Sequence, residues 1–372
     1  MAGLYFHIPF CKQACHYCDF HFSTNRTLVN EMVNALAKEM ALQKSYLGGE
    51  ALETIYFGGG TPSLLSKNDV EQLVEMARNM FPVDNNVEIT FEANPDDLTL
   101  KKLEELKSAG INRLSIGIQS FNDTVLKFFN RAHTVAQAEA SVRNAQVTGF
   151  NNISVDLIYG IPGQTLDELK NDVSKFLQLN PQHISAYALT IEKNTVFGHR
   201  LKNGEFSTIS EDSSAEQFEY LMKEFNLAGY GQYEISNFCK PGFQSKHNTS
   251  YWQQKKYLGV GPSAHSYDGN SRQWNVSNNH LYLKSLLNDR VPFEREVLTH
   301  SNQINEYFFT TLRTSWGTDL KYLKTRFGFV PHLPKIDVMQ QQGLIVVENE
   351  VISLTQKGKL LADKIALEFF ID

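Results

Sequence analysis

The chain has 372 residues, of which 42% are hydrophobic and 20% are charged, and its formal net charge is −6. This composition is typical of a soluble globular protein large enough for two or three structural units. The negative net charge argues against a nucleic-acid-binding protein, which needs a broad basic face.

The sequence also bears on localisation. The chain contains no run of about 18 apolar residues that could form a transmembrane helix. Its N-terminus lacks the basic and apolar regions of a secretory signal. We therefore expect a cytoplasmic protein whose thiols are reduced and available to metals. Peripheral contact with a membrane surface stays open.

Three of the four cysteines lie near the N-terminus, directly after an apolar segment expected to form a strand at residues 4–8. They are Cys11, Cys15 and Cys18, with the spacing C-x3-C-x2-C. Thiolates this close together can converge on one small object, and soft thiolates favour an iron–sulfur cluster. Three protein ligands would leave one iron of a cubane free to hold a small chelating molecule.

Two other interpretations of these cysteines stay open at this point. Structural zinc would need a fourth ligand, for which His7, His16 and His21 are available. A disulfide with one free thiol would need an oxidising compartment, of which the sequence gives no sign. The fourth cysteine, Cys239, is expected to be a buried thiol without a chemical role.

From residue 4 to about residue 230, short β-rich segments alternate with helical ones. Six β–α units predict a parallel sheet with crossover helices, arranged as an incomplete TIM-like (β/α)6 barrel or as a flat doubly wound sheet. In either fold the chemistry belongs at the carboxyl ends of the strands. The expected strands are residues 4–8, 54–57, 87–91, 113–118, 153–158 and 183–189, and the expected helices are residues 28–46, 68–80, 100–109, 135–148, 166–179 and 211–228.

Helix-terminal signals support several of these boundaries. Ser66 or Asn68 can cap the helix at residues 68–80, and Thr99 can cap the helix at residues 100–109. Glycines at positions 110, 149 and 229 each follow a helical segment, where a left-handed residue commonly ends a helix.

Glycine-rich or polar residues follow the predicted strands. Glycines allow the backbone to approach a ligand closely. Charged groups that follow successive strands lie together at the carboxyl edge of the sheet, which indicates a binding site. Each of them taken singly has an ordinary structural explanation. They are Gly58-Gly59-Gly60-Thr61-Pro62 after the second strand, Glu92 after the third, Gln119 after the fourth, Asp156 in the fifth and Ala188 in the sixth, with Arg131 after a short helical stretch.

The segment from Tyr5 to Phe20, YFHIPFCKQACHYCDF, resembles the radical S-adenosylmethionine (SAM) superfamily, whose signature is the same C-x3-C-x2-C. More narrowly, it resembles the oxygen-independent coproporphyrinogen III oxidase-like branch. The resemblance implies the incomplete (β/α)6 barrel, a [4Fe–4S] cluster on the three cysteines, and SAM at the open iron. The oxidase of this branch has another cysteine two residues after the third. Here that position is Phe20, which favours the haem chaperones of the branch over the oxidase.

The resemblance also implies a set of SAM contacts. Arg131 suits the carboxylate of SAM, because a guanidinium forms paired hydrogen bonds, and acidic residues suit its amine or ribose hydroxyls. Whether an electron donor reduces the cluster and SAM is then cleaved stays open, and so does the chain's status as an enzyme. The implied contacts are Tyr5, Gly59, Glu92, Gln119, Arg131, Asp156 and Ala188, with Tyr17, Gly60 and Thr61 near a second SAM that some members hold.

Past residue 229 the β–α alternation stops, and the segment His247-Asn248-Thr249-Ser250-Tyr251-Trp252 follows. It offers an imidazole, an amide and two aromatic faces, which suit an iron porphyrin. An ordinary turn packed on the barrel is the alternative interpretation. The pattern H-N-x-x-Y-W resembles a haem-associated motif of the chaperone group, which implies haem contacts at His247, Asn248, Tyr251 and Trp252. His247 is the candidate axial ligand, and His7 and His265 compete with it.

The last segment predicts helices at residues 302–314, 320–327 and 334–342, a hairpin at residues 344–347 and 351–354, and a final helix at residues 356–370. Helices followed by a hairpin indicate a mainly helical, winged-helix-like module. Because the chain lacks a Lys/Arg stripe for DNA, we expect a lid or docking surface. The predicted domains are a barrel at residues 1–230, a connecting segment at 231–300 and this module at 301–372.

Together these features predict a radical-SAM-type haem chaperone with a [4Fe–4S] cluster and SAM. Its cargo would be haem b, delivered to haem-requiring respiratory proteins. The alternative is an oxygen-independent coproporphyrinogen III oxidase of porphyrin biosynthesis. Expected partners are haem, its acceptor proteins and an electron donor for the cluster, without nucleic acid. A homodimer is implied by the resemblance alone.

Overall fold

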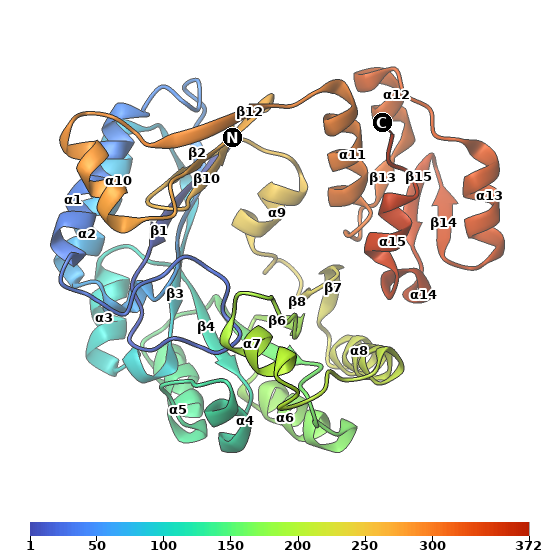
Figure 1. The fold of residues 1–372 in the computed structure, drawn as a ribbon, viewed down its shortest axis with the longest axis horizontal. Coiled ribbons are helices and arrows are strands. Elements are labelled where there is room, and N and C mark those ends of the chain that lie inside the picture. Colours follow the sequence, from blue (N-terminus) through green and yellow to red (C-terminus); the bar gives the residue numbers. More distant parts are fainter. Residues whose placement is uncertain (372) are drawn as a thin grey trace.

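The computed structural model describes residues 1–371. Its main feature is a curved twelve-stranded sheet with a separate small module at the C-terminus (Figure 1). The first six strands are neighbours in chain order, and each pairs with the next in parallel. The prediction of six parallel strands is therefore confirmed. They are β1 (Ala2–Ile8), β2 (Leu52–Gly59), β3 (Val83–Ala93), β4 (Arg113–Gln119), β5 (Ile153–Tyr159) and β6 (His183–Ala188).

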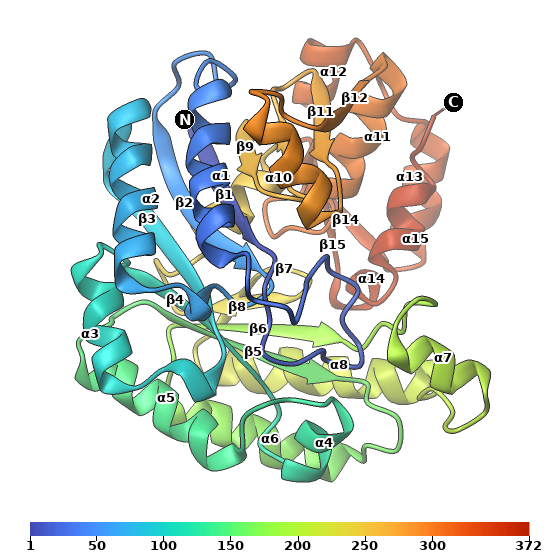
Figure 2. The same ribbon diagram turned by 60° about the vertical axis from the view of Figure 1, so that its left-hand side comes forward.

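The crossover helices form one continuous layer outside this sheet (Figure 2). Consecutive helices pack against one another in chain order, so a single face of the sheet is covered. A flat doubly wound sheet would place helices on both faces, and the incomplete barrel is therefore the fold observed. The helices of this layer are α1 (Val29–Leu42), α2 (Lys67–Met80), α3 (Leu100–Ser108), α5 (Val135–Val147), α6 (Leu166–Leu179) and α8 (Glu211–Leu227).

The local signals at the helix ends are also confirmed. Ser66 caps α2 in a reciprocal capping box with Asp69, and the Thr99 side chain accepts a hydrogen bond from the backbone of α3. The glycines at positions 110, 149 and 229 have φ values of 89°, 83° and 85°. The short helical stretch expected before Arg131 is α4 (Asp123–Phe128), whereas three other short helices near the strand ends were not predicted: η1 (Pro62–Leu64), η2 (Pro95–Asp97) and α7 (Val196–Lys202).

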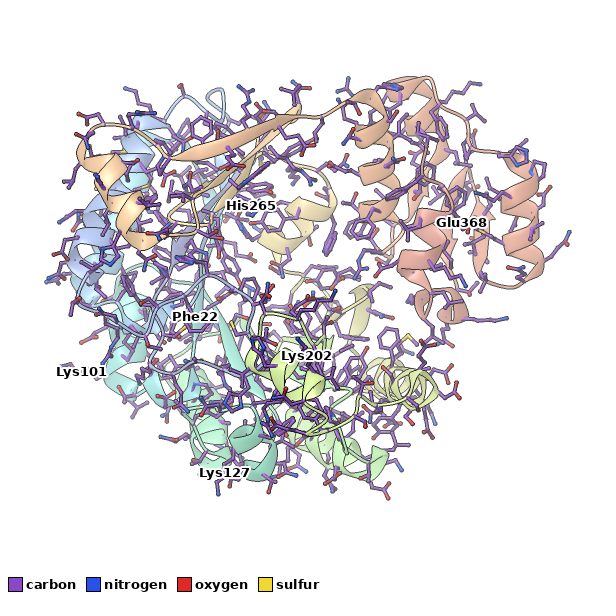
Figure 3. All side chains as sticks on the ribbon, in the orientation of Figure 1. Phe22, Lys101, Lys127, Lys202, His265 and Glu368 are labelled. Carbon is purple, nitrogen blue, oxygen red and sulfur yellow. The ribbon has the colours of Figure 1, made fainter. Side chains whose placement is uncertain are left out.

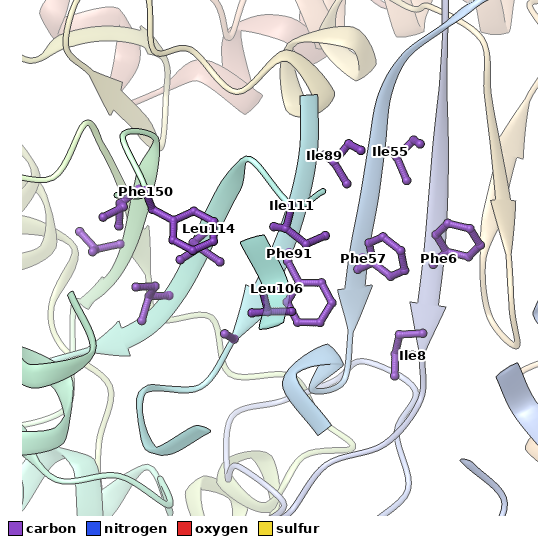
Figure 4. Packing of buried hydrophobic residues seen from close by; sticks show 14 of the residues in the cluster. Phe6, Ile8, Ile55, Phe57, Ile89, Phe91, Leu106, Ile111, Leu114 and Phe150 are labelled. Carbon is purple, nitrogen blue, oxygen red and sulfur yellow. The ribbon is translucent and has the colours of Figure 1, made fainter. Parts of the chain in front are cut away.

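The core between sheet and helices is built from alternate residues of the strands. Phe6, Phe57 and Phe91 are register partners on β1, β2 and β3, and their rings pack side by side (Figure 4). Successive side chains of a strand point to opposite faces, so Tyr5 and His7 of β1 point to the inside of the barrel. The helix-facing core thereby fixes which residues face the interior.

Residues 231–300, expected to connect the two units, extend the sheet at both of its edges. β9 pairs in parallel with β1, and β10–β12 continue antiparallel, while β8 and β7 follow β6 at the other edge. The elements are β7 (Gly231–Glu234), β8 (Asn237–Cys239), α9 (Lys246–Trp252), β9 (Tyr257–Val260), β10 (His265–Tyr267), β11 (Ser271–Asn275), α10 (Asn279–Leu287) and β12 (Phe293–Val297).

The C-terminal module has its own three-stranded sheet and its own hydrophobic core. The hairpin is confirmed, and its turn residues Asn349 and Glu350 both have positive φ, as a tight hairpin turn requires. The final helix was wrongly predicted as continuous, because Leu361 leaves helical geometry and the chain turns there so that Ile365 reaches the module's core. The elements are α11 (His300–Thr311), β13 (Thr318–Asp319), α12 (Leu320–Phe327), α13 (Leu333–Gln341), β14 (Ile345–Glu348), β15 (Val351–Leu354), α14 (Gln356–Lys359) and α15 (Ala362–Leu367).

None of the helices in residues 1–371 has the length and apolar character needed to cross a bilayer.

Candidate cofactor site

The cysteine-bearing loop leaves β1 at the carboxyl edge of the sheet and runs toward α7 (Figure 2). Its ends are tied together, because the Cys11 amide donates to the Ser23 carbonyl (3.0 Å) and the Ser23 amide donates to the Pro9 carbonyl (2.9 Å). Its middle is held by His16, whose amide donates to Phe129 and whose carbonyl accepts from Phe197. The fold therefore presents the loop at the rim.

All three loop cysteines are free, half-buried thiols, and Cys239 is a free buried one. The disulfide interpretation therefore finds no support. Among residues 1–371, no three His, Cys, Asp or Glu side chains are grouped closely enough to hold a single metal ion. In a cubane, each thiolate binds a different iron, so the three sulfurs do not need to meet at one point.

The histidines that could complete a zinc site are engaged elsewhere. A ring nitrogen of His7 lies 2.9 Å from the His21 carbonyl, and one of His16 lies 2.9 Å from the Phe128 carbonyl. Nε2 of His21 lies 2.8 Å from the Asn279 side chain. Within residues 1–371, none of these histidines is grouped with two of the loop cysteines closely enough to hold one metal ion.

Two polar groups contact the thiol sulfurs directly. The Thr61 hydroxyl donates to Cys11 Sγ at 3.4 Å, and the guanidinium of Arg131 donates to Cys15 Sγ at 3.3 Å. Burial raises the pKa of Cys18 to about 11, since it disfavours the thiolate. A bound metal would reverse that preference, and hydrogen bonds to the sulfurs tune the potential of a cluster.

Arg131 is the most constrained side chain of the site. Its Nη2 donates to Asn94 Oδ1 and to the Gly117 carbonyl, both at 2.7 Å, and its Nη1 also reaches the Tyr17 hydroxyl at 3.4 Å. Its Nε is buried and has no partner among the described residues. An unpaired buried donor costs about 1–3 kcal/mol, so Arg131 is one acceptor short. The carboxylate of SAM has the chemistry of the missing acceptor.

A cavity of about 110 Å³ opens beside this arginine at the ends of β2, β3, β4 and β5. Six of the ten residues implied as SAM contacts line it. Gly59 and Tyr17 adjoin it through hydrogen bonds to Glu92 and Arg131, whereas Tyr5 and Ala188 line two larger clefts on either side. The six lining residues are Gly60, Thr61, Glu92, Gln119, Arg131 and Asp156.

Two half-buried carboxyl groups face this cavity. Glu92 accepts from the Tyr56 hydroxyl (2.7 Å) and from the Gly59 amide (3.2 Å), and Asp156 accepts from Ser115 (3.5 Å). Burial raises the pKa of Glu92 to about 7 and that of Asp156 to about 6. A cationic ligand beside them would favour their ionised forms, so the cavity suits an amine or sulfonium.

The backbone at the rim explains why glycines occupy β2's end. A Cβ on Gly59 would lie 2.6 Å from the His7 ring, and one on Gly60 would lie 2.7 Å from the carbonyl oxygens of Ile8 and Phe10. Gln119, at the end of β4, has a left-handed φ of 73°, which is strained for a residue with a side chain. Such strain is common where side chains are aimed at a ligand.

The structure adds residues that the sequence analysis did not select. Asn94 connects the two halves of the site, because its amide donates to Thr61 at 3.3 Å while its oxygen accepts from Arg131. Tyr56 and Ser115 hold the two carboxyl groups. Asn94 could have been identified from the sequence, because it directly follows the third strand. Tyr56 and Ser115 lie inside strands, where no local sequence pattern marks them as site residues.

Comparison with known proteins agrees with this geometry. Residues 5–176 match the radical SAM superfamily, and residues 298–361 match the HemN C-terminal domain. The chain is 37% identical over 373 residues to "Heme chaperone HemW" of Bacillus subtilis, covering 98% of each chain. It is 38% identical over 377 residues to the protein of that name from Escherichia coli, covering 99% of this chain and 98% of the other.

The chain belongs to the HemW family. Its fold is also that of coproporphyrinogen III oxidase (HemN) from Escherichia coli, with a TM-score of 0.86, 23% identity, and coverage of 99% of this chain and 90% of that one. Membership of the radical SAM superfamily implies SAM and a [4Fe–4S] cluster. The buried, unpartnered Nε of Arg131 and the three free thiols at the rim fit that pair of cofactors.

The H-N-x-x-Y-W segment of this HemW family member forms α9, capped by Ser245. His247 is buried, with Nδ1 2.7 Å from the Thr54 hydroxyl and Nε2 2.7 Å from the Tyr251 hydroxyl. Its ring stacks on Tyr56, and burial lowers its pKa to about 3, so it is neutral. Both of its ring nitrogens are therefore engaged within the protein.

The other residues of the segment face different spaces. Asn248 lines a small polar cavity of about 60 Å³ inside the barrel, which it shares with Glu92 and Asp156. Tyr251 and Trp252 line a cleft of about 850 Å³ between the edge of the sheet, the cysteine loop and α11. That cleft is large enough for a drug-sized or larger ligand.

Proposed function

We propose that this chain is a radical-SAM-type haem chaperone that binds haem b and delivers it to haem-requiring respiratory proteins. The observation that carries the proposal is identity of 37% and 38%, over nearly the whole length, to proteins named as haem chaperones. An aromatic-lined cleft of about 850 Å³ next to the cysteine loop supports it, because a flat apolar cargo needs such a space.

In this proposal the [4Fe–4S] cluster binds to Cys11, Cys15 and Cys18, and SAM lies in the cavity at the strand ends. When bound, the two cofactors supply one-electron chemistry at the sulfonium. Arg131 pairs with the SAM carboxylate, and Glu92 and Asp156 meet the cationic and hydroxyl groups. The remaining proposed contacts are Tyr5, Gly59, Gln119 and Ala188, with Tyr17, Gly60 and Thr61 beside a second SAM.

The test is a haem titration of anaerobically reconstituted protein. We expect a stoichiometric complex with a Soret band, and brown protein with four irons and four sulfides per chain before haem is added. Cys15→Ser should lose the cluster, whereas Cys239→Ser should keep it, because Cys239 is remote from the loop. A protein that binds no haem would contradict the proposal.

Oxygen-independent coproporphyrinogen III oxidation is the alternative activity. Phe20 occupies the position at which the oxidase has a further cysteine. An anaerobic assay with coproporphyrinogen, SAM and a reductant separates the two, since a chaperone yields no protoporphyrinogen. The same reconstituted protein serves to test the other proposed partners. Transfer assays test the electron donor and the acceptor proteins, sizing in solution tests homodimerisation, and vesicle flotation tests contact with a membrane surface.

A further inference from the structure

One wall of the large cleft is a single face of the β10–β11 hairpin. His265 is the register partner of Trp274, and Tyr267 is the register partner of Arg272. Because alternate residues and their cross-strand partners share a face, these four side chains lie on one side of the hairpin. His265, Tyr267 and Arg272 line the cleft. In Figure 3, His265 lies beside α9 on the side of the sheet toward the C-terminal module.

His265 differs from the other cleft-lining histidines in having no hydrogen-bond partner. Within residues 1–371 its ring forms no hydrogen bond; it is exposed and stacks on Trp274 with 6.2 Å between ring centroids. Both nitrogens of His7 have partners, at the Tyr5 hydroxyl and the His21 carbonyl. Nε2 of His21 is held by Asn279. His265 is therefore the cleft histidine with neither ring nitrogen engaged within the described residues, so it can bind a ligand without breaking an existing contact.

Large apolar side chains are exposed on the opposite walls of the same cleft. Phe20 of the cysteine loop is 71% exposed, Phe309 of α11 is 38% exposed and Phe370 near the C-terminus is 39% exposed. Tyr251 and Trp252 add aromatic surface from α9. Exposed aromatic groups that share one concave space indicate a binding site for a flat apolar ligand.

Cationic groups stand at the edge of this aromatic space. Arg272 pairs with Glu306 of α11 at 2.8 Å, and its Nε is buried without a partner among the described residues. Lys255 pairs with Glu53 at 2.7 Å and also lines the cleft. A guanidinium with a spare donor suits a carboxylate, so the space offers a nitrogen ligand, flat walls and a carboxylate partner together.

We propose that haem binds in this cleft with the imidazole of His265 as the axial ligand of its iron. Phe20, Trp252 and Phe309 cover the porphyrin, and Arg272 meets a propionate. This inference rests on the proposed haem-chaperone function and names the site of its cargo. His247 is then a positioning residue, whose ring holds the Tyr251 hydroxyl from behind the cleft wall.

The experiment compares haem difference spectra and affinities of cluster-loaded, full-length variants. His265→Ala should weaken haem binding at least about tenfold and remove the spectrum of histidine-ligated iron. Added imidazole should restore that spectrum in His265→Gly, because it can occupy the space of the missing ring. His280→Ala is the matched control, since His280 is exposed on α10 and does not line the cleft.

His247→Gln tests the competing ligand, because glutamine can keep hydrogen bonds to Thr54 and Tyr251 but is a poor iron ligand. We expect it to retain the histidine-ligated spectrum. Unchanged affinity and spectrum in His265→Ala, or loss of the histidine spectrum in a folded His247→Gln protein, would overturn this site while leaving haem binding intact. Absence of haem binding by the wild type would instead contradict the proposed function itself.

Discussion

At the scale of single residues, the cofactor site is organised by half-buried charged groups. Arg131 brings one permanent positive charge between Cys15, Tyr17 and Asn94, and Glu92 and Asp156 bring two titratable groups to the other side of the cavity. Buried charges are costly unless they are paired. The arrangement therefore favours a ligand that is itself zwitterionic, with its carboxylate toward Arg131 and its cationic groups toward the carboxyls.

Arg131→Lys should weaken SAM binding by about tenfold or more, because an ammonium cannot make the several directed contacts of a guanidinium. Equilibrium dialysis of SAM against reconstituted protein measures the change, with iron and sulfide content as the check that the cluster persists. Arg143→Lys is the matched control, since Arg143 is exposed on α5. Equal affinity of the two variants would exclude Arg131 as the carboxylate partner.

The raised pKa of Glu92 predicts two opposite pH dependences. In the unliganded protein the folded-state pKa is about 7, above the ordinary value of 4.5. The folded state therefore holds the proton more tightly, and its stability falls as pH rises from about 4.5 to about 7. SAM binding should strengthen over the upper part of this range, because the cation needs ionised Glu92.

Glu92→Gln should reduce the slope of stability against pH, measured by urea denaturation without ligand, and should flatten the profile of SAM binding, each measured at pH 5, 6, 7 and 8. Part of the stability slope should remain, because burial also raises the pKa of Glu39 to about 7. Asp156, whose pKa is raised to about 6, contributes a residual slope at the lower end. Profiles that keep their full slope in Glu92→Gln would show that another group is responsible.

At the scale of elements, one buried carboxylate connects α1 to the hairpin that forms the cleft wall. Glu39 accepts from Gln43 (2.8 Å) and Asn275 (2.7 Å) at one oxygen, and from the Gly261 amide (2.8 Å) and the Tyr282 hydroxyl at the other. The first helix is thereby joined to β11, to the loop after β9 and to α10. This network fixes the hairpin that carries His265.

Glu39→Ala should lower the free energy of unfolding by about 3–5 kcal/mol, because it leaves four buried donors without an acceptor. Urea denaturation measures this loss. Glu31→Ala provides the comparison on the same helix, where the side chain is exposed, and should change stability by less than about 0.5 kcal/mol. Similar losses in both variants would mean that the network contributes little.

The elements that were predicted are those with a strong local signal. Buried parallel strands form continuous apolar segments and their helices are amphipathic, so β1–β6 and their crossover helices were predicted correctly. β9 was missed because it contains Gly259, where a Cβ would lie 2.1 Å from the His265 carbonyl. Glycine weakens the strand signal, although here close packing of two strands requires it.

At the scale of the whole molecule, the cysteine loop, glycine turn and rim residues could be located from the sequence because each follows its own strand. The large cleft could not be located in this way. Its walls come from residues 19–21, from β10–β11 and from α11, which are far apart in the chain. No local sequence pattern indicates that α11 lies against these segments, because the position of α11 depends on how the C-terminal module docks on the barrel.

Docking of the module depends on contacts at its interface with α9 and β7. Arg313 lies over Trp252 at 5.6 Å and over Phe309 at 5.7 Å, and it also pairs with Asp363. The Ser315 amide donates to the Tyr233 carbonyl at 2.9 Å. A guanidinium between two aromatic rings contributes about 0.5–2 kcal/mol, so Arg313 stabilises α11 at the far wall of the cleft.

Arg313→Ala should therefore reduce haem affinity while leaving cluster content and SAM binding at wild-type levels, because the cofactor site lies entirely in the barrel. The loss should be about two- to thirtyfold, which corresponds to about 0.5–2 kcal/mol of stacking energy that holds α11 in place. Hydrogen exchange should accelerate in α11 and stay unchanged in β1–β6.

Arg326→Ala is the matched control, since Arg326 stacks on Phe327 at the exposed surface of the same module. A parallel loss of SAM binding would show that the module supports the barrel itself, and unchanged haem affinity would show that α11 forms no necessary wall of the haem site.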